Sequence, residues 1–278
     1  MLSFDHTFAS QPGSAREKTA ERLPIVAVSH LDIGYGDKIV LRGLNFTVET
    51  GEILFLLGAS GSGKSTLLKH MIGLASPLAG KILIGGRNLA TAEGAEREAI
   101  LQEIGVAYQQ GALLRSLTLK ENVRLPLERF SDLPLEAMNE VAALVLAQVG
   151  LAAAAEALPE RVSGGMQKRA AIARAIVLSP KVVFLDEPSA GLDPISAAGL
   201  DLLIRHLADG LGLTFVIASH ELSSLFAIAD RAIMLREGHG LIADGTPQAL
   251  RDASPDPYVR RFLGSDAHER TRRRESSP

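Results

Sequence analysis

The stretch "ILFLLGASGSGKSTLLKHMIGL", residues 53–74, carries the strongest structural signal in the chain. Its first five residues are apolar and predict a short buried strand, and its second half predicts an amphipathic helix. Between them, residues 58–65 fit the pattern G-x-x-x-x-G-K-[ST], whose glycines let backbone N–H groups turn inward around a polyphosphate. The helix N-terminus adds the positive end of its dipole at the same point. The alternative is a glycine-rich turn that binds nothing, and the flanking strand and helix argue against it.

The motif assigns a role to each of its side chains. Lys64 is expected to bridge the β- and γ-phosphates of a nucleotide, and the Ser65 hydroxyl to complete the shell of a Mg²⁺ ion. The residues expected to bind the nucleotide here are Gly58, Ala59, Ser60, Gly61, Ser62, Gly63, Lys64, Ser65 and Thr66.

A second motif fits the first. The segment "KVVFLDEP", residues 181–188, predicts an apolar strand that ends in two adjacent carboxylates. Asp186 is expected to hold Mg²⁺ through its water shell, and Glu187 to act as the general base on the attacking water. Taken alone, the pair could be a solvated strand end. Beside a phosphate loop, the catalytic interpretation is favoured.

Outside these two motifs, the chain divides into regions with different sequence patterns. Residues 1–23 are polar, and strand-like segments begin near Ile25. Helical, Ala/Leu/Glu-rich segments follow over about 110–165, and a strand and helix alternation returns after them. The runs "VVFL" and "FVIA" are short, continuously apolar and rich in β-branched residues, which is typical of a parallel sheet buried on both faces. We therefore expect an α/β core interrupted by a helical insertion.

The composition excludes several classes of protein. The chain has 278 residues, of which 46% are hydrophobic, so it can bury a core and is not disordered as a whole. The net charge of −3 gives no reason to expect a nucleic-acid partner. Without cysteine there is no disulfide framework, thiolate metal site or cysteine nucleophile. We expect no signal peptide and no membrane span, since polar residues interrupt the most apolar long segment, residues 141–158.

A third motif, "VSGGMQKRAAIARAI" at residues 162–176, resembles the signature sequence of the ATP-binding cassette (ABC) ATPases. With the other two motifs, the resemblance extends over residues 24–250. It implies a P-loop NTPase (RecA-like) α/β core with a small antiparallel β subdomain and a helical insertion subdomain at about 110–165. It further implies hydrolysis of ATP with Mg²⁺ in a homodimer, where the signature of one subunit closes over the ATP held by the other. Residues 1–23 would be a flexible leader, and 251–278 a C-terminal extension.

The resemblance also carries over residue by residue. Ser163, Gly164, Gly165 and Met166 match the signature residues that contact the ATP of the other subunit, and a capped helix without this role is the alternative. Gln109 matches the glutamine that contacts Mg²⁺ and the membrane partner, with Gln110 as the alternative register. Asp193 matches the residue that communicates across the dimer. His220 matches the histidine on the γ-phosphate, and Tyr35 the aromatic residue on adenine; a structural histidine and a strand-face aromatic are the alternatives.

Three positions depart from the family pattern. Val162 replaces the usual leucine, Met166 the usual glutamine, and Tyr108 the commoner phenylalanine. The methionine removes a polar group near the ATP of the other subunit. Since the serine and both glycines remain, we expect no loss of activity.

A finer resemblance is to the ATPase subunits of Mla-type phospholipid transporters. It rests on the signature methionine and on "LLKHMIGL", "QQGALLRSLTLKENV", "DEPSAGLDPISAAGLD" and "DPYVRRFL". It implies a peripheral protein at the cytoplasmic face of an inner membrane, with an integral permease (MlaE-like), an MCE-domain lipid-binding protein (MlaD-like) and a STAS-domain protein (MlaB-like) as partners. The ATPase subunit of an amino acid or other solute importer is one alternative. A soluble cassette protein that acts on DNA or ribosomes is another.

Two further expectations concern surfaces. The helical insertion is the expected docking surface for the permease, so charge reversal at Glu121 or Arg124 should uncouple transport while ATP binding is spared. The Arg-rich stretch 269–274 could be a solvated tail, or could contact lipid headgroups or the neighbouring subunit. The resemblance favours contact with the subunit.

Overall fold

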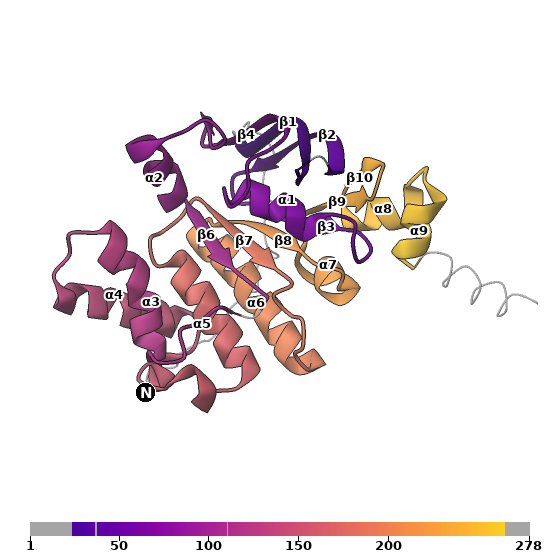
Figure 1. Ribbon diagram of the computed structural model, residues 1–278. Helices are drawn as coiled ribbons and strands as arrows, with labels where there is room; N and C mark the ends of the chain where they lie inside the picture. Colours follow the sequence, from indigo (N-terminus) through magenta and orange to yellow (C-terminus); the bar gives the residue numbers. More distant parts are fainter. Residues whose placement is uncertain (1–23, 37, 110, 265–278) are drawn as a thin grey trace, which may run out of the picture.

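The computed structural model describes residues 24–36, 38–109 and 111–264. The expected leader and the Arg-rich stretch 269–274 lie outside these residues, as does Gln110. The expected fold class is confirmed, because two sheets and their covering helices form the α/β architecture (Figure 1).

The larger sheet carries the phosphate loop. Its six strands are ordered β10-β9-β3-β8-β7-β6, and every neighbouring pair is parallel except β10 with β9. The strands are β3 (Ile53–Leu57), β6 (Ile104–Ala107), β7 (Val182–Asp186), β8 (Thr214–Ala218), β9 (Arg231–Arg236) and β10 (Gly240–Gly245). The runs "VVFL" and "FVIA" form β7 and β8, which are neighbours and buried on both faces as predicted.

The smaller sheet is antiparallel, in the order β2-β1-β4-β5. Its strands are β1 (Pro24–Tyr35), β2 (Lys38–Glu49), β4 (Ala79–Ile84) and β5 (Arg87–Asn88). Figure 1 shows it above the larger sheet, with helix α1 (Lys64–Met71) beneath it. One hydrophobic cluster joins the two sheets through the buried side of α1.

A second hydrophobic cluster packs the helices against the other face of the larger sheet. Side chains alternate along a strand, so Ile53, Phe55 and Leu57 of β3 belong to this cluster, whereas Leu54 and Leu56 belong to the first. These helices are α3 (Leu119–Phe130), α4 (Leu135–Gln148), α5 (Gly164–Ile176), α6 (Pro194–Leu211), α7 (Leu222–Ile228), α8 (Pro247–Ala253) and α9 (Pro257–Phe262), with 3₁₀ turns at Ala152–Ala154 and Pro159–Arg161. Helix α2 (Gly94–Gln102) instead places Ile100 in the first cluster.

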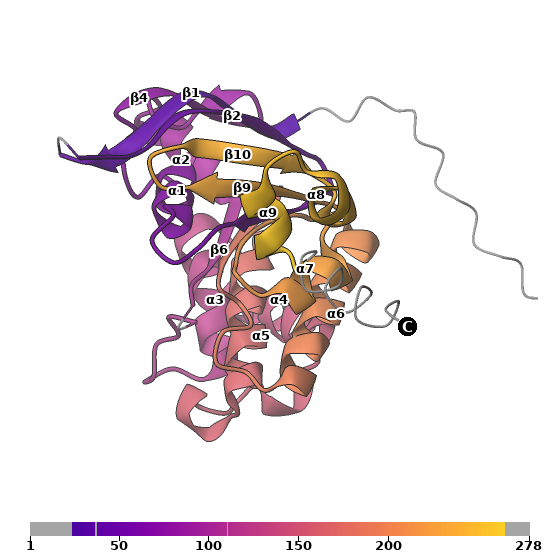
Figure 2. The same ribbon diagram turned by 90° about the vertical axis from the view of Figure 1, so that its right-hand side faces the viewer.

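Two groups of helices lie at opposite sides of the larger sheet. Helices α3 and α4 pack on each other and on α5, to one side of the sheet. Helices α8 and α9 lie at the opposite side, beside β9 and β10 (Figure 2), where Arg236 of β9 lies over the Tyr258 ring of α9 at 4.8 Å. Of the helices in the described ranges, none combines the length and apolar character needed to cross a membrane.

Candidate functional site

The phosphate loop and the carboxyl end of β7 meet in one cleft of about 940 Å³ at the carboxyl ends of the central strands. The predicted residues that line it are Tyr35, residues 59–66, Gln109, Glu187 and His220. The cleft is also lined by side chains that the sequence did not single out, among them Glu237 and Phe262. Phe262 comes from α9, so the C-terminal part of the chain forms part of the wall.

Glycine is required at two points of the phosphate loop. A Cβ atom on Gly58 would lie 2.3 Å from the Ser62 Oγ and 2.5 Å from the Leu235 carbonyl oxygen. Gly63 has φ +97° and immediately precedes α1, a conformation that L side chains rarely adopt. No described side chain caps the N-terminus of α1, so its first N–H groups are available to an anion.

The Lys64 side chain is buried at the point where the phosphate loop leads into α1. Its Nζ donates to the carbonyl oxygens of Gly58, at 2.8 Å, and of Ala59, at 3.2 Å. Burial lowers the pKa of Lys64, and the carboxylates of Glu187 and Asp186 oppose that shift. The carbonyl groups of the loop therefore hold the Lys64 ammonium in place. The oxygens of a bound phosphate would be stronger hydrogen-bond acceptors for the same ammonium.

Asp186 and Ser65 form an oxygen-rich corner beside the lysine. The Ser65 Oγ donates to the Asp186 Oδ1 at 3.0 Å. Burial raises the pKa of Asp186, and the Ser65 hydrogen bond counteracts the shift. A hydroxyl, a carboxylate and the nearby Gln109 are the hard oxygen donors that Mg²⁺ prefers, and one carboxylate is typical where the substrate's phosphates supply further ligands. These residues therefore fit a nucleotide-bound Mg²⁺.

Glu187 is oriented by contacts on its side chain and its backbone. Its Oε1 lies 2.8 Å from the His220 Nδ1, and its Oε2 accepts a hydrogen bond from the Ser219 Oγ at 3.2 Å. Its own N–H donates to the Ala218 carbonyl at 2.8 Å. Glu187 has φ +46°, an uncommon conformation for a residue with a side chain, and such strain is concentrated at functional sites. Ser219 was not predicted from the sequence.

The signature residues do not line the cleft of their own chain. Ser163 is the N-cap of α5, and its Oγ accepts from the Met166 N–H at 3.3 Å. Ser163 and Gly164 are exposed. Asp193 similarly caps α6, where its carboxylate accepts from the N–H groups of Ile195 and Ser196, each at 3.0 Å. In this chain both residues cap helices, and the exposure of Ser163 and Gly164 leaves the N-terminus of α5 accessible to an external ligand.

Two cations on α5 hold the Gln109 loop, and sequence reasoning missed both. The Lys168 Nζ donates to the Gln109 carbonyl. The Arg174 guanidinium donates to the carbonyls of Gly111, at 2.9 Å, and Ala112, at 2.8 Å. Burial lowers the pKa of Arg174. These contacts tie the signature helix to the loop that carries Gln109.

Tyr35 ends β1 at the rim of the cleft. Its side chain is 52% exposed, although aromatic rings usually bury more of their surface. Its ring centroid is 6.3 Å from that of the buried His70, at a tilt of 55°. One face of the ring is thus supported, and the ring is accessible to a nucleotide base.

The sequence and the fold both have known counterparts. Residues 41–190 match the family described as ABC transporter. The intermembrane phospholipid transport system ATP-binding protein MlaF of Escherichia coli K12 is 37% identical over 228 residues, which cover 82% of this chain and 84% of that protein. MlaF of Haemophilus influenzae is 35% identical over 243 residues, covering 87% and 91%. A dimeric structure of the ATP-binding cassette MJ0796, in a post-hydrolysis state with ADP and Pi, matches with a TM-score of 0.71 and 29% identity over 80% of this chain and 98% of that one.

Proposed function

The chain belongs to the ABC transporter family of ATPases, and from this membership we propose that it is the ATP-hydrolysing subunit of a transporter that moves phospholipid between two membranes. The observation that supports hydrolysis is the Glu187–His220 pair, which lies in the same cleft as the phosphate loop. The observation that supports the cargo is the similarity to MlaF, which extends over most of both chains.

Binding begins at the phosphate loop. The glycine-rich backbone and the open N-terminus of α1 receive the phosphates, and the Lys64 ammonium exchanges the Gly58 and Ala59 carbonyls for phosphate oxygens. Ser65, Asp186 and Gln109 would hold a Mg²⁺ ion, which would supply positive charge to the phosphates. Tyr35 offers its exposed ring to the adenine.

Hydrolysis depends on Glu187. With its proton on Nδ1, His220 donates to the Glu187 Oε1 and fixes the direction of the carboxylate. The carboxylate then orients the attacking water and accepts its proton. The second donor, Ser219, holds the other carboxylate oxygen, so that the side chain does not turn away from the water.

A second copy of the chain completes each site in this proposal. Ser163, Gly164, Gly165 and Met166 would contact the ATP of the neighbouring subunit, because the N-terminus of α5 is exposed and does not face its own cleft. Asp193 would lie at the same interface. The dimeric state of the similar cassette MJ0796 supports this arrangement.

The similarity to MlaF supports a proposal for the remaining partners. We place the homodimer at the cytoplasmic face of an inner membrane, on an integral permease (MlaE-like), with an MCE-domain protein (MlaD-like) and a STAS-domain protein (MlaB-like) in the complex. The net charge of −3 supports the absence of a nucleic-acid partner.

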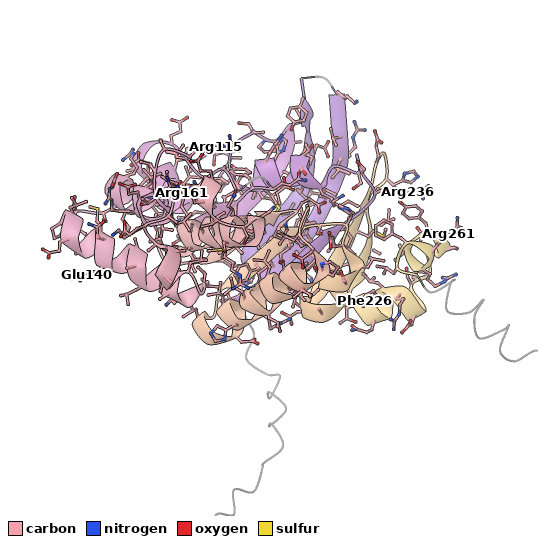
Figure 3. The ribbon with its side chains drawn as sticks, turned by 90° about the horizontal axis from the view of Figure 1, so that it is seen from below. Arg115, Glu140, Arg161, Phe226, Arg236 and Arg261 are labelled. Atoms are coloured by element: carbon pink, nitrogen blue, oxygen red, sulfur yellow. The ribbon has the colours of Figure 1, made fainter. Side chains whose placement is uncertain are left out.

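The docking hypothesis for the helical part needs different test residues. Glu121 belongs to a capping box, in which its Oε2 accepts from the Thr118 N–H at 2.7 Å, so reversing its charge would also disturb the start of α3. Arg124 donates to the Asn139 side chain on α4, at 2.6 Å, and so helps to join the two helices. Arg115 is exposed on the segment between Gln109 and α3, and Figure 3 shows it on the helical side of the molecule, away from Arg236.

The substitution Arg115→Glu is expected to lower transport by the assembled complex roughly tenfold, because it reverses the charge of an exposed side chain in the proposed docking segment, where charge complementarity with the permease would be lost. ATP affinity of the isolated chain should be unchanged, since Arg115 does not line the cleft. Lipid transfer between vesicles and ATP binding are measured in parallel. Charge reversal at Glu140, an exposed residue of α4 that is labelled in Figure 3, is the control. Normal transport by Arg115→Glu would remove this segment from the docking surface.

The proposed function is tested by isolating the tagged Glu187→Gln chain from its own membranes in mild detergent, with the partners identified by mass spectrometry. A permease together with an MCE-domain protein is the expected result. A permease with a soluble solute-binding receptor would replace phospholipid with a solute as the cargo. Recovery of no membrane protein would contradict the transporter assignment.

A further inference from the structure

Lys168 is the one described cation of the signature helix that contacts both loops around the catalytic carboxylate. It lies five residues after Ser163, in α5. Its Nζ donates to the carbonyl oxygen of Gln109 and, at 3.4 Å, to that of Glu187. These carbonyls follow β6 and β7, which are neighbouring parallel strands. A single ammonium group therefore connects the signature helix with the two loops that carry Gln109 and Glu187.

The environment of this ammonium indicates a specific role. Burial lowers the pKa of Lys168, and the carboxylates of Glu187 and Asp186 oppose the shift. Removing a lysine from water is costly unless its charge is met by hydrogen-bond acceptors, and here two main-chain carbonyls supply them.

The contact acts on a residue with an uncommon backbone conformation. Glu187 has φ +46°, and its N–H is already fixed to the Ala218 carbonyl of β8. The hydrogen bond from Lys168 fixes the carbonyl group of Glu187, on the other side of its Cα atom. The direction of the Glu187 side chain depends on these two peptide groups, so a displacement of Lys168 would turn the carboxylate relative to His220 and the attacking water.

We propose that Lys168 is a positioning residue that couples the two ATP sites of the dimer. When the N-terminus of α5 closes over the ATP of the neighbouring subunit, Lys168 moves with it and sets Gln109 and Glu187 in its own chain. Arg174, about two turns further along α5, holds the far side of the Gln109 loop, so that this loop is attached to the signature helix at a second point. The inference rests on the dimer proposed above.

The test compares Lys168→Met and Lys168→Arg with the unmodified chain in the assembled transporter. For Lys168→Met we expect kcat to fall roughly tenfold, because a misplaced base loses most of its effect. The Hill coefficient for ATP should fall to about 1, and the affinity for a fluorescent ATP analogue should stay within about twofold, since Lys168 does not line the cleft. Lys168→Arg should recover most of kcat and of the Hill coefficient, because guanidinium can donate to both carbonyls.

The control is Lys181→Met, which removes a lysine that pairs with Glu103 away from the cleft. Equal loss of kcat, ATP affinity and melting temperature in Lys168→Met would show a structural role only and overturn the proposal. So would an unchanged kcat, or a Hill coefficient of 1 in the unmodified complex. A complex that fails to hydrolyse ATP at all would instead overturn the proposed function.

Discussion

Replacing Glu187 with glutamine is expected to reduce ATP hydrolysis about a thousandfold and to leave ATP bound. The amide keeps the size of the side chain and can still pair with His220 and Ser219, but it cannot accept a proton from water. Phosphate release at saturating ATP measures the first effect. Equilibrium binding of radiolabelled ATP measures the second, and the ATP-bound dimer should accumulate.

Glu96→Gln is the matched control, because Glu96 is an exposed residue of α2 outside the cleft. It should hydrolyse ATP at the normal rate. If Glu187→Gln kept more than about a tenth of the normal kcat, Glu187 would not be the general base. A loss of ATP binding in the same variant would show that its carboxylate contributes to binding.

The substitution Lys64→Ala is expected to weaken ATP binding by about two orders of magnitude, because hydrogen bonds to charged groups contribute about 1.5–3 kcal/mol each and Lys64 donates more than one. Its two present acceptors, the Gly58 and Ala59 carbonyls, would lose their donor, so the empty loop should become less ordered as well. Titration with ATP by calorimetry gives the dissociation constant directly.

Lys81→Ala, at an exposed position of β4, controls for the loss of a lysine charge. The melting temperature of Lys64→Ala without nucleotide separates a binding defect from a folding defect. Unchanged ATP affinity in a folded Lys64→Ala protein would contradict the role of the loop.

The sequence was most informative where a motif is local. The phosphate loop depends on glycines at fixed spacing, and the structure shows why Gly58 and Gly63 cannot carry a side chain. Strands β7 and β8 were recognisable because burial on both faces leaves a continuous apolar run.

The sequence was least informative where contacts join segments that are far apart along the chain. Lys168 and Gln109 are 59 residues apart, and nothing in either local pattern predicts their hydrogen bond. Phe262 reaches the cleft from the far end of the chain. The apolar, alanine-rich segment 141–158 is helical only in its first part: α4 ends at Gln148, and beyond Gly150, which has φ +75°, only a short 3₁₀ turn forms. Alanine has a high helix propensity on both sides of Gly150, so propensity alone does not predict that only the first segment forms an α-helix.

The alternation of side chains along β3 has a thermodynamic consequence. Because this single strand of five residues supplies side chains to both hydrophobic clusters, neither cluster can lose its order without disturbing the strand that leads into the phosphate loop. Nucleotide that binds only the folded loop therefore shifts the unfolding equilibrium of the whole α/β core, by about 2.7 kcal/mol when its concentration is a hundred times the dissociation constant. The melting temperature of the α/β core therefore reports whether nucleotide occupies the cleft.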